Sequence, residues 1–387
     1  MSFRDLGDYS DWVEFADAQS ALGRADRPPI TAAEVRARLG FPGDAAPIDP
    51  RVERVWERDG IAGEEISWSV GFGPRTRAWL LRPASASGPL PGVLALHDHS
   101  AFKLLGKEKI ADGPDGPDAR VRELRRLEYD GLAFANRLAM RGFAVLVPDV
   151  FLWGSRRFSD DLVRPRSRAT PAPDWLAPDP GEPVEPGDVA SYNRAARWHE
   201  HVVEKYCALL GTTIAGVVAY EDRIAAGYLA SRTDVRAGGV GCIGLSGGGC
   251  RAALLQATSN DIAIAVVVAM MSTYRHLLDR HVAPHTWMFF PPGLAGWTDW
   301  PDVAASRAPV PLVVQYVLGD ELFPAEGMRA AHERIGATYL AAGAPEAYVG
   351  EFYEGRHWFT MTMQDTAFDH LAAWAARADD QGASSGE

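Results

Sequence analysis

The stretch at residues 239–250, GVGCIGLSGGGC, constrains the fold more than any other part of the chain. It combines two different glycine patterns. From Gly239 to Gly244 it reads G-x-G-x-x-G, a pattern whose turn can receive a phosphate group. From Gly244 to Gly248 it reads G-x-S-x-G, a pattern whose tight turn can expose the hydroxyl of Ser246. The two patterns require different positions for the preceding strand, so the surrounding sequence must decide between them.

Apolar, strand-like runs alternate with helix-like segments over most of the 387 residues. The predicted strands lie at residues 64–70, 76–84, 92–100, 143–150, 238–246, 262–270, 311–319 and 347–355. The predicted helices lie at residues 126–142, 189–231, 247–259, 325–343 and 366–378. Continuous apolar strands are typical of parallel sheets that are covered on both faces. The alternation therefore predicts an α/β fold with a mostly parallel central sheet and helices on both of its faces.

The sequence also divides into segments of different character. They are an N-terminal helical arm at 1–60, a main domain at 61–378, irregular insertions at about 151–188 and 272–308, and a tail at 379–387. In the arm, Thr31 and Glu34 have the spacing of a capping box at a helix start. Repeated prolines forbid regular structure in the first insertion. The polar tail is predicted to be disordered.

Composition limits the function classes. The chain has 39 Lys and Arg against 51 Asp and Glu, so its net charge is −12. This balance argues against binding to nucleic acid or to an anionic membrane. The three cysteines lack the spacing of a disulfide framework. The N-terminus has no apolar stretch of the kind found in signal peptides. These features predict a cytoplasmic protein.

The dinucleotide interpretation of residues 239–250 fails on its context. Val240, Cys242 and Ile243 lie among the glycines and form the natural buried strand, so this spacing falls inside a strand rather than in a turn. The serine interpretation fits, because a strand precedes Ser246 and a helix follows it. Its turn would expose the hydroxyl at the carboxyl end of the sheet. The backbone N–H of Gly247 could then stabilise an oxyanion.

A serine nucleophile needs a base and an acid that orients the base. Asp320 directly follows the predicted strand at 311–319, and His357 directly follows the strand at 347–355. Both come after Ser246 in the order serine, acid, histidine, which is the order of this strand–turn–helix architecture. Glu321 is an alternative acid at the same strand end.

These residues carry a resemblance. The chain resembles the α/β-hydrolase superfamily, and more narrowly its dienelactone-hydrolase-like and acetyl-xylan-esterase-like serine esterases, over about residues 64–376. The stretches that carry it are LALHDHSAFKLLGKEK, YDGLAFANRLAMRGFAVLVPDVFLWGSR, SRTDV, GLSGGG, VLGDELFP and EGRHWF. The resemblance implies that Ser246 is the nucleophile, Asp320 the acid and His357 the base. Dienelactone hydrolases use a cysteine nucleophile, so the serine favours the esterase branch.

The chain departs from this family in one loop. Many relatives have His-Gly after the third strand, where this chain has HDHS at residues 97–100. The family's second oxyanion donor is a backbone N–H in this loop. We therefore expect it to come from His99 or Ser100.

Metal and nucleotide chemistry have weaker support. The H-x-H patterns at residues 97–99 and 199–201 lack the further ligands of known zinc signatures, and H-E-x-x-H is absent. The histidines on the predicted helix are expected at solvated positions. The expectation is no metal and no organic cofactor. Three lysines of the adjoining loop could be solvated or could hold an anionic substrate, and they are Lys103, Lys107 and Lys109.

Side chains that follow strands or lie in the aromatic insertion are candidates for a substrate pocket. Trp153 and Arg156 are predicted at its rim, and Trp287 and Phe289 along its walls. The aromatic pair could equally cover the sheet. The predicted function is hydrolysis of a small to medium carboxylic ester or lactone through an acyl-enzyme. The alternatives are a thioesterase, an acyltransferase or a biosynthetic cyclase that uses the same triad. The oligomeric state stays open, with a homodimer among the alternatives.

Overall fold

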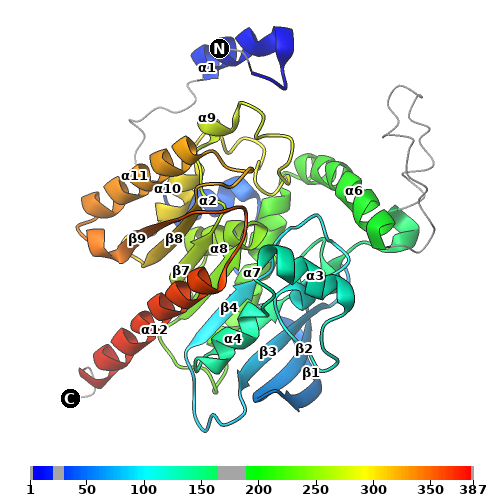
Figure 1. Cartoon of the computed structure of the whole chain (residues 1–387), viewed down its shortest axis with the longest axis vertical. Helices are drawn as coiled ribbons and strands as arrows, with labels where there is room; N and C mark the ends of the chain where they lie inside the picture. The colour runs from blue at the N-terminus through cyan, green and yellow to red at the C-terminus, as the bar shows by residue number, and fades with distance from the viewer. Residues whose placement is uncertain (1–2, 21–29, 164–188, 385–387) are drawn as a thin grey trace.

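A nine-stranded sheet runs through the computed structural model, which describes residues 3–20, 30–163 and 189–384 (Figure 1). Its strands are β1 (Ile48–Arg58), β2 (Ile61–Ser69), β3 (Thr76–Pro83), β4 (Gly92–Leu96), β5 (Ala144–Pro148), β6 (Val240–Leu245), β7 (Ile262–Val268), β8 (Leu312–Val317) and β9 (Tyr348–Tyr353). Their order across the sheet is β1-β2-β3-β5-β4-β6-β7-β8-β9. Strands β5, β4 and β6 to β9 are parallel to one another, and β1 to β3 pair antiparallel. The predicted mostly parallel sheet is confirmed.

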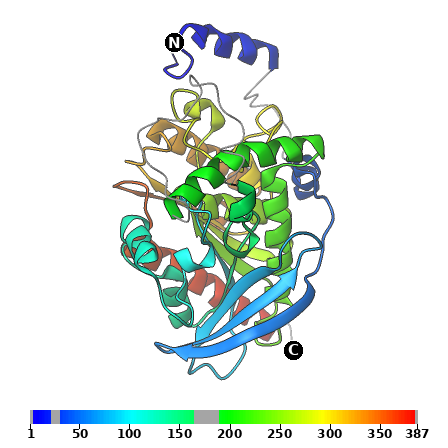
Figure 2. The same cartoon turned by 90° about the vertical axis from the view of Figure 1, so that its right-hand side faces the viewer.

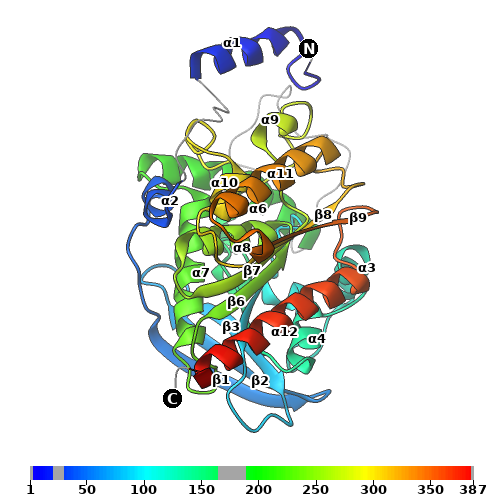
Figure 3. The same ribbon diagram turned by 90° about the vertical axis from the view of Figure 1, so that its left-hand side faces the viewer.

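Helices cover both faces of this sheet. The principal ones are α2 (Ala32–Leu39), α3 (Ala119–Glu128), α4 (Phe134–Met140), α6 (Val189–Leu209), α7 (Ile214–Ala230), α8 (Gly247–Thr258), α10 (Trp300–Ala305), α11 (Ala325–Ala341) and α12 (Met361–Ser384). One core contains side chains of α2, α7, α8, α10 and α11, and the other contains those of α4 and α12. Figure 3 shows α2 and α7 on one side of the sheet and α12 and α4 on the other.

Side chains alternate between the two faces of each strand, and this alternation explains how one sheet contributes to two hydrophobic cores. On β4, Leu94 and Leu96 belong to the first core, whereas Val93 and Ala95 belong to the second. Successive side chains on a strand point to opposite faces, so an unbroken apolar run fills both. All five residues of β4 are buried.

The N-terminal arm corrects the sequence prediction. Helices α1 (Ser10–Ser20) and α2 are present, and the capping box of Thr31 and Glu34 is confirmed. However, residues Ile48–Arg58 form β1 and pair with β2, so the expected helical arm at 1–60 ends in a strand of the sheet. The reason is tertiary, because an isolated polar strand gains its backbone hydrogen bonds only from its neighbour. Figure 2 shows β1 and β2 at the outer edge of the molecule.

Two predicted helices are each broken in two. The segment at 126–142 ends one helix at Glu128 and begins another at Phe134, and Asp130 and Gly131 between them have positive φ. The segment at 189–231 bends by 85° between α6 and α7. No single described helix is long and apolar enough to cross a membrane, and only this bent pair passes such a test by length and composition.

The predicted insertions and tail differ in outcome. The proline-rich part of the insertion at 151–188 lies outside the described residues from 164 onward. The insertion at 272–308 is irregular, as predicted, apart from the short helices α9 (Tyr274–Leu277) and α10. Helix α12 continues to Ser384, so the structure describes residues 379–384 of the predicted disordered tail as helical. Residues 385–387 lie outside the described residues.

Candidate active site

Ser246 lies on a sharp turn between β6 and α8. Its φ of 56° and ψ of −116° lie outside the usual regions for a residue with a side chain. Two backbone hydrogen bonds hold it there: its N–H donates to the Val268 carbonyl at 2.9 Å, and its carbonyl accepts from the Cys250 N–H at 2.8 Å. A strained residue persists only where the surrounding structure requires it. The turn therefore has the geometry of a nucleophile elbow.

Two glycines make this turn sterically feasible. A Cβ atom on Gly244 would lie 2.4 Å from the Gly248 backbone carbon. A Cβ on Gly248 would lie 2.1 Å from the carbonyl oxygen of Leu96 in the neighbouring strand. Only a hydrogen fits at either position, which explains the two glycines of the G-x-S-x-G pattern.

Asp320 and His357 meet at the carboxyl ends of β8 and β9. The Nδ1 atom of His357 is 2.6 Å from Oδ2 of Asp320, and the Asp320 side chain is buried. Its other oxygen accepts the Leu322 N–H at 2.8 Å. The alternative acid, Glu321, is exposed. The structure thus pairs the histidine with Asp320.

The charges around His357 set its proton affinity. Burial favours the neutral imidazole. The hydrogen bond and charge of Asp320 outweigh this effect, with smaller contributions from Glu128 and Asp98, and they raise the pKa of His357 above its usual value. Because Nδ1 is bonded to Asp320, Nε2 is the nitrogen left to exchange a proton with a substrate or a nucleophile.

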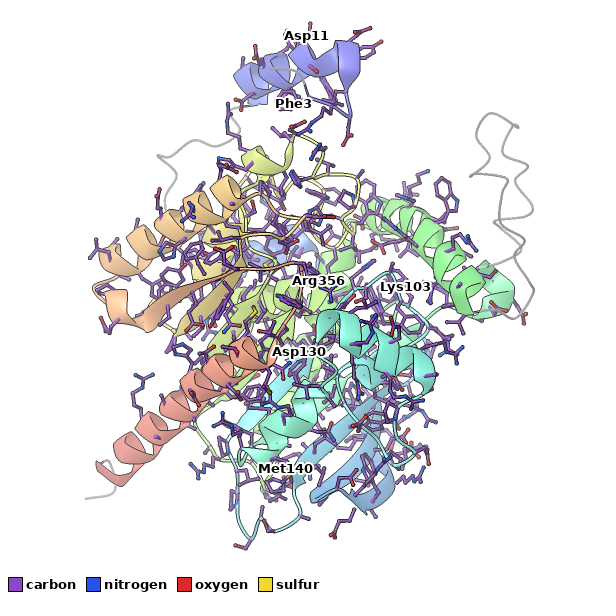
Figure 4. All side chains as sticks on the ribbon, in the orientation of Figure 1. Phe3, Asp11, Lys103, Asp130, Met140 and Arg356 are labelled. Atoms are coloured by element: carbon purple, nitrogen blue, oxygen red, sulfur yellow. The ribbon has the colours of Figure 1, made fainter. Side chains whose placement is uncertain are left out.

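The three predicted residues share one edge of the sheet. Ser246, Asp320 and His357 each follow the carboxyl end of a parallel strand, where ligands bind in this kind of sheet. Figure 4 labels Arg356, the neighbour of His357, near the middle of the molecule. Within the described residues, the Ser246 hydroxyl has no hydrogen bond to His357. Such contacts are often loose without substrate and tighten in the complex.

A candidate oxyanion site lies beside the elbow. Gly247 is the first residue of α8, and the first N–H groups of a helix have no partner within it. A Cβ on Gly247 would lie 2.6 Å from the backbone nitrogen of His99. Among the residues described, that nitrogen donates to no protein acceptor. The close approach of Gly247 to the His99 nitrogen favours His99 over Ser100 as the second donor.

Buried charges support the inner side of the loop at residues 97–109. Asp98 pairs with Lys109, whose Nζ is 3.2 Å from Oδ2 and also donates to the carbonyls of Asp98 and His99. The hydroxyls of Tyr129 and Ser100 donate to the same carboxylate. These groups satisfy the Asp98 carboxylate inside the protein. Sequence analysis did not identify this support, because only the folded loop brings Lys109 back to Asp98 and only the packing at the end of α3 brings Tyr129 there.

Glu128 lies in contact with this cluster and near His357. Its Oε2 is 2.5 Å from the Ser100 hydroxyl, which also contacts Asp98. A single hydroxyl proton cannot serve two carboxylates, so one of them must carry a proton of its own. Burial, reinforced by the charge of Asp98, raises the pKa of Glu128 to about 7.

The loop lysines do not face solvent as predicted. Lys103, Lys107 and Lys109 are buried, and each has a carboxylate partner. Lys107 Nζ lies 3.0 Å from Oδ2 of Asp149. Neither predicted role, solvated charges or contacts with an anionic substrate, fits cations that the protein itself neutralises. A buried charge is stable only when it is paired, so the structure rather than a ligand determines these positions.

The predicted rim residues also turn inward. The Trp153 ring is 1% exposed, and its Nε1 donates to the His99 carbonyl at 3.4 Å. Arg156 is 3% exposed and pairs with Glu221. The prediction that these two residues lie on the rim is therefore wrong. Arg156 also donates to the Phe72 carbonyl between β2 and β3 at 3.0 Å, so contacts with the protein itself hold both side chains.

Trp287 and Phe289, predicted along the walls of a substrate pocket, lie in two different environments. Phe289 is buried and stacks on Trp300, with ring centroids 5.1 Å apart, in an aromatic cluster. Trp287 is partly exposed, and its indole donates to His201 at 2.7 Å. It lines an apolar groove of about 420 Å³ along α6. Ser246 is not among the residues that line this groove, so contact of Trp287 and Phe289 with a substrate stays a prediction.

Two histidines, which as a residue type can be metal ligands, instead contact the backbone that follows Asp320. His281 Nδ1 lies 3.1 Å from the carbonyl oxygen of Glu321, and His285 Nε2 lies 3.1 Å from that of Leu322. These contacts bind the backbone that follows Asp320. Over residues 3–20, 30–163 and 189–384, no three His, Cys, Asp or Glu side chains are grouped so that they could hold a metal ion.

Comparisons with known proteins agree with this architecture. No protein-family model matches the chain. It is 23% identical over 337 residues to "Putative hydrolase YtaP" of Bacillus subtilis (strain 168), which covers 87% of this chain and 96% of that protein.

Solved structures extend the comparison to the fold. A glucuronoyl esterase from Solibacter usitatus is similar at a TM-score of 0.60 and 14% identity, covering 92% of this chain and 96% of that one. Acetyl xylan esterase 1 from Thermoanaerobacterium sp. JW/SL YS485 is similar at a TM-score of 0.56 and 13% identity, covering 92% and 98%. The chain has the α/β-hydrolase fold, and the resemblance found in its sequence is confirmed at the level of the fold.

Proposed function

We propose that this chain is a serine carboxylester hydrolase, acting on a small to medium ester or lactone through a Ser246, His357 and Asp320 triad. The observation that carries the proposal is the elbow conformation of Ser246 at the sheet edge where His357 pairs with Asp320. The esterase and hydrolase relatives support the same class of reaction. A lone serine on a turn would have neither a base nor an acid at the carboxyl ends of other strands of the sheet.

The proposed reaction uses the Ser246 hydroxyl, Nε2 of His357 and two backbone N–H groups. The Ser246 hydroxyl attacks the acyl carbon, and Nε2 of His357 takes its proton and passes it to the leaving alkoxide. Asp320 keeps the other ring nitrogen protonated and stabilises the imidazolium. The N–H groups of Gly247 and His99 hold the oxyanion. Water then releases the acid from Ser246, and an alcohol in its place would give acyl transfer.

The charge distribution supports a substrate whose acyl group is uncharged. The three loop lysines near the candidate oxyanion site are each neutralised by a buried carboxylate, so none of these three is available to bind an anion. Aromatic rings instead stand beside the base, and Phe323 has its ring centroid 6.5 Å from that of His357. Such surroundings favour an apolar or neutral group next to the ester.

Covalent labelling tests the nucleophile directly. The purified protein is incubated with a fluorophosphonate and weighed intact by mass spectrometry, beside a Ser246→Ala variant. We expect one adduct per chain in the wild type and none in the variant, together with loss of p-nitrophenyl acetate turnover in both the labelled protein and the variant. An active wild-type preparation that takes up no label, or a Ser246→Ala variant with undiminished turnover, would overturn the proposal.

A further inference from the structure

The backbone of His99 needs a fixed position if its N–H is to serve as an oxyanion donor, and α6 supplies a side chain that reaches this loop. Glu200 of α6 is 3% exposed and lies 101 residues from His99 in sequence. Its Oε2 is 3.3 Å from His99 Nε2 and 2.5 Å from Lys103 Nζ. Figure 4 labels Lys103 beside α6. The contact therefore joins α6 to the loop that carries the candidate donor.

The second oxygen of Glu200 binds a different segment. Its Oε1 accepts the Trp287 N–H at 2.8 Å and the Thr286 hydroxyl at 2.5 Å. The hydroxyl of Thr286 in turn accepts the Met288 N–H at 3.1 Å, so its proton is directed to Glu200. One carboxylate thus joins the loop at residues 97–109, called the oxyanion loop below, to the insertion at residues 272–308.

The protonation of His99 follows from its own neighbours. The Ala101 N–H donates to Nδ1 of His99 at 3.0 Å, so Nδ1 carries no proton. Burial lowers the pKa of His99, which favours the neutral ring with its proton on Nε2. That proton points to Glu200. Burial alone would raise the pKa of Glu200, but Lys103 and His99 lower it well below its usual range, so the carboxylate is ionised.

All four partners of Glu200 are donors, and only a carboxylate satisfies them. It offers acceptor oxygens on both sides, whereas an amide offers an oxygen on one side and N–H donors on the other. A glutamine at position 200 would place its own N–H groups against two of the donors. The Lys103 ammonium would also lose its negative partner, keeping only the Trp153 ring, whose centroid is 4.1 Å away.

We propose that Glu200 is a positioning residue that fixes the backbone N–H of His99 in the oxyanion site by binding donors from two separate segments. The inference rests on the proposed function. The carbonyl of His99 is held from the other side by Lys109 Nζ at 3.0 Å and Trp153 Nε1 at 3.4 Å. The peptide that carries the His99 N–H has the Asp98 carbonyl as its other polar group, and Lys109 Nζ also donates to that oxygen at 2.9 Å. With the His99 side chain held by Glu200 and the carbonyls of Asp98 and His99 both held by Lys109, this peptide has little freedom to rotate.

The decisive variant is Glu200→Gln, assayed with p-nitrophenyl acetate. Loss of a whole oxyanion donor costs about 10²–10³-fold in kcat, so a donor that is only misaligned should cost about 10- to 100-fold. We expect KM to change by less than about threefold, because the donor acts mainly in the transition state. Binding of a trifluoromethyl ketone, whose adduct with Ser246 carries the oxyanion, should weaken by a similar factor.

Glu221→Gln is the matched control. Glu221 is also buried, pairs with Arg156 and accepts a backbone N–H, that of Phe151 at 2.9 Å, but it does not contact the oxyanion loop. We expect Glu221→Gln to keep kcat within about twofold of the wild type, even if its stability falls. An equal loss of kcat in both variants would overturn the proposal.

A double variant separates positioning from charge neutralisation. Glu200→Gln combined with Lys103→Met removes the unpaired ammonium, so we expect thermal stability to recover while kcat stays low. The same double variant serves as the test protein if Glu200→Gln alone does not fold. Recovery of wild-type kcat in the double variant, or a folded Glu200→Gln with unchanged kcat, would overturn the inference. Ser246→Ala in the same assay isolates the proposed function, because only failure of that function would leave its turnover intact.

Discussion

The serine turn at residues 244–248 and the loop at residues 97–109 meet at the candidate oxyanion site, but different forces hold their backbones. The turn depends on missing side chains, since neither Gly244 nor Gly248 has room for a Cβ atom. The loop depends on side chains that are present and charged, with Asp98 and Lys109 buried together on its inner side. One half of the site is thus built by short-range sterics. The other is built by buried ion pairs, both within the loop and to distant residues such as Glu200 and Asp149.

This contrast predicts different sensitivities. A steric turn should tolerate changes in charge around it but fail when an atom is added. A loop held by buried ion pairs should tolerate the loss of both partners better than the loss of one, because a single uncompensated charge remains costly in the interior. Three substitutions test these expectations.

Lys109→Met should have the largest effect on stability. It leaves Asp98 ionised and buried without its cation, which typically costs about 3–5 kcal/mol of unfolding free energy. Urea unfolding followed by tryptophan fluorescence measures the change. Asp98→Asn combined with Lys109→Met should recover most of the loss. If the single variant stays within about 0.5 kcal/mol of the wild type, the loop does not depend on this ion pair.

Gly248→Ala should break the turn by adding one carbon. The new Cβ would lie 2.1 Å from the Leu96 carbonyl oxygen, so the start of α8 and the end of β4 would have to separate. Overpacking typically costs about 1–3 kcal/mol, and a clash between two backbones belongs at the upper end of that range. Gly88→Ala is the control, because nothing lies within 4 Å of a Cβ there. Equal urea midpoints for the two variants would contradict the steric account.

Glu128→Gln should have the smallest effect, on pH dependence. Glu128 is ionised above its pKa of about 7, and its charge there favours the protonated form of His357, so removing it should lower the pKa of the histidine. The base is active when neutral, and the acid limb of kcat/KM should therefore move to lower pH, by less than about one unit. Glu123→Gln, at an exposed position of the same helix, should leave the profile unchanged. An acid limb that stays in place or moves to higher pH would show that Glu128 does not act on His357.

The sequence predicted those features whose causes are local. Continuous apolar runs specify strands that are buried on both faces, and the glycines around Ser246 specify a turn between a strand and a helix. The order of Asp320 and His357 after parallel strands was readable for the same reason, since the ends of parallel strands share one edge. The predictions failed where contacts with residues outside a segment determine its structure. Residues Ile48–Arg58 form a strand only because β2 pairs with them.

The site shows the same division in its individual residues. Sequence alone determined the fold, the elbow at Ser246 and two candidate acids, because periodicity and steric demand act over a few residues. Only the tertiary structure decided between Asp320 and Glu321, brought His99 to Gly247, and buried Glu200 against a loop about 100 residues away. The free energy of a buried charge depends on which partners packing brings to it, and no local pattern records those partners.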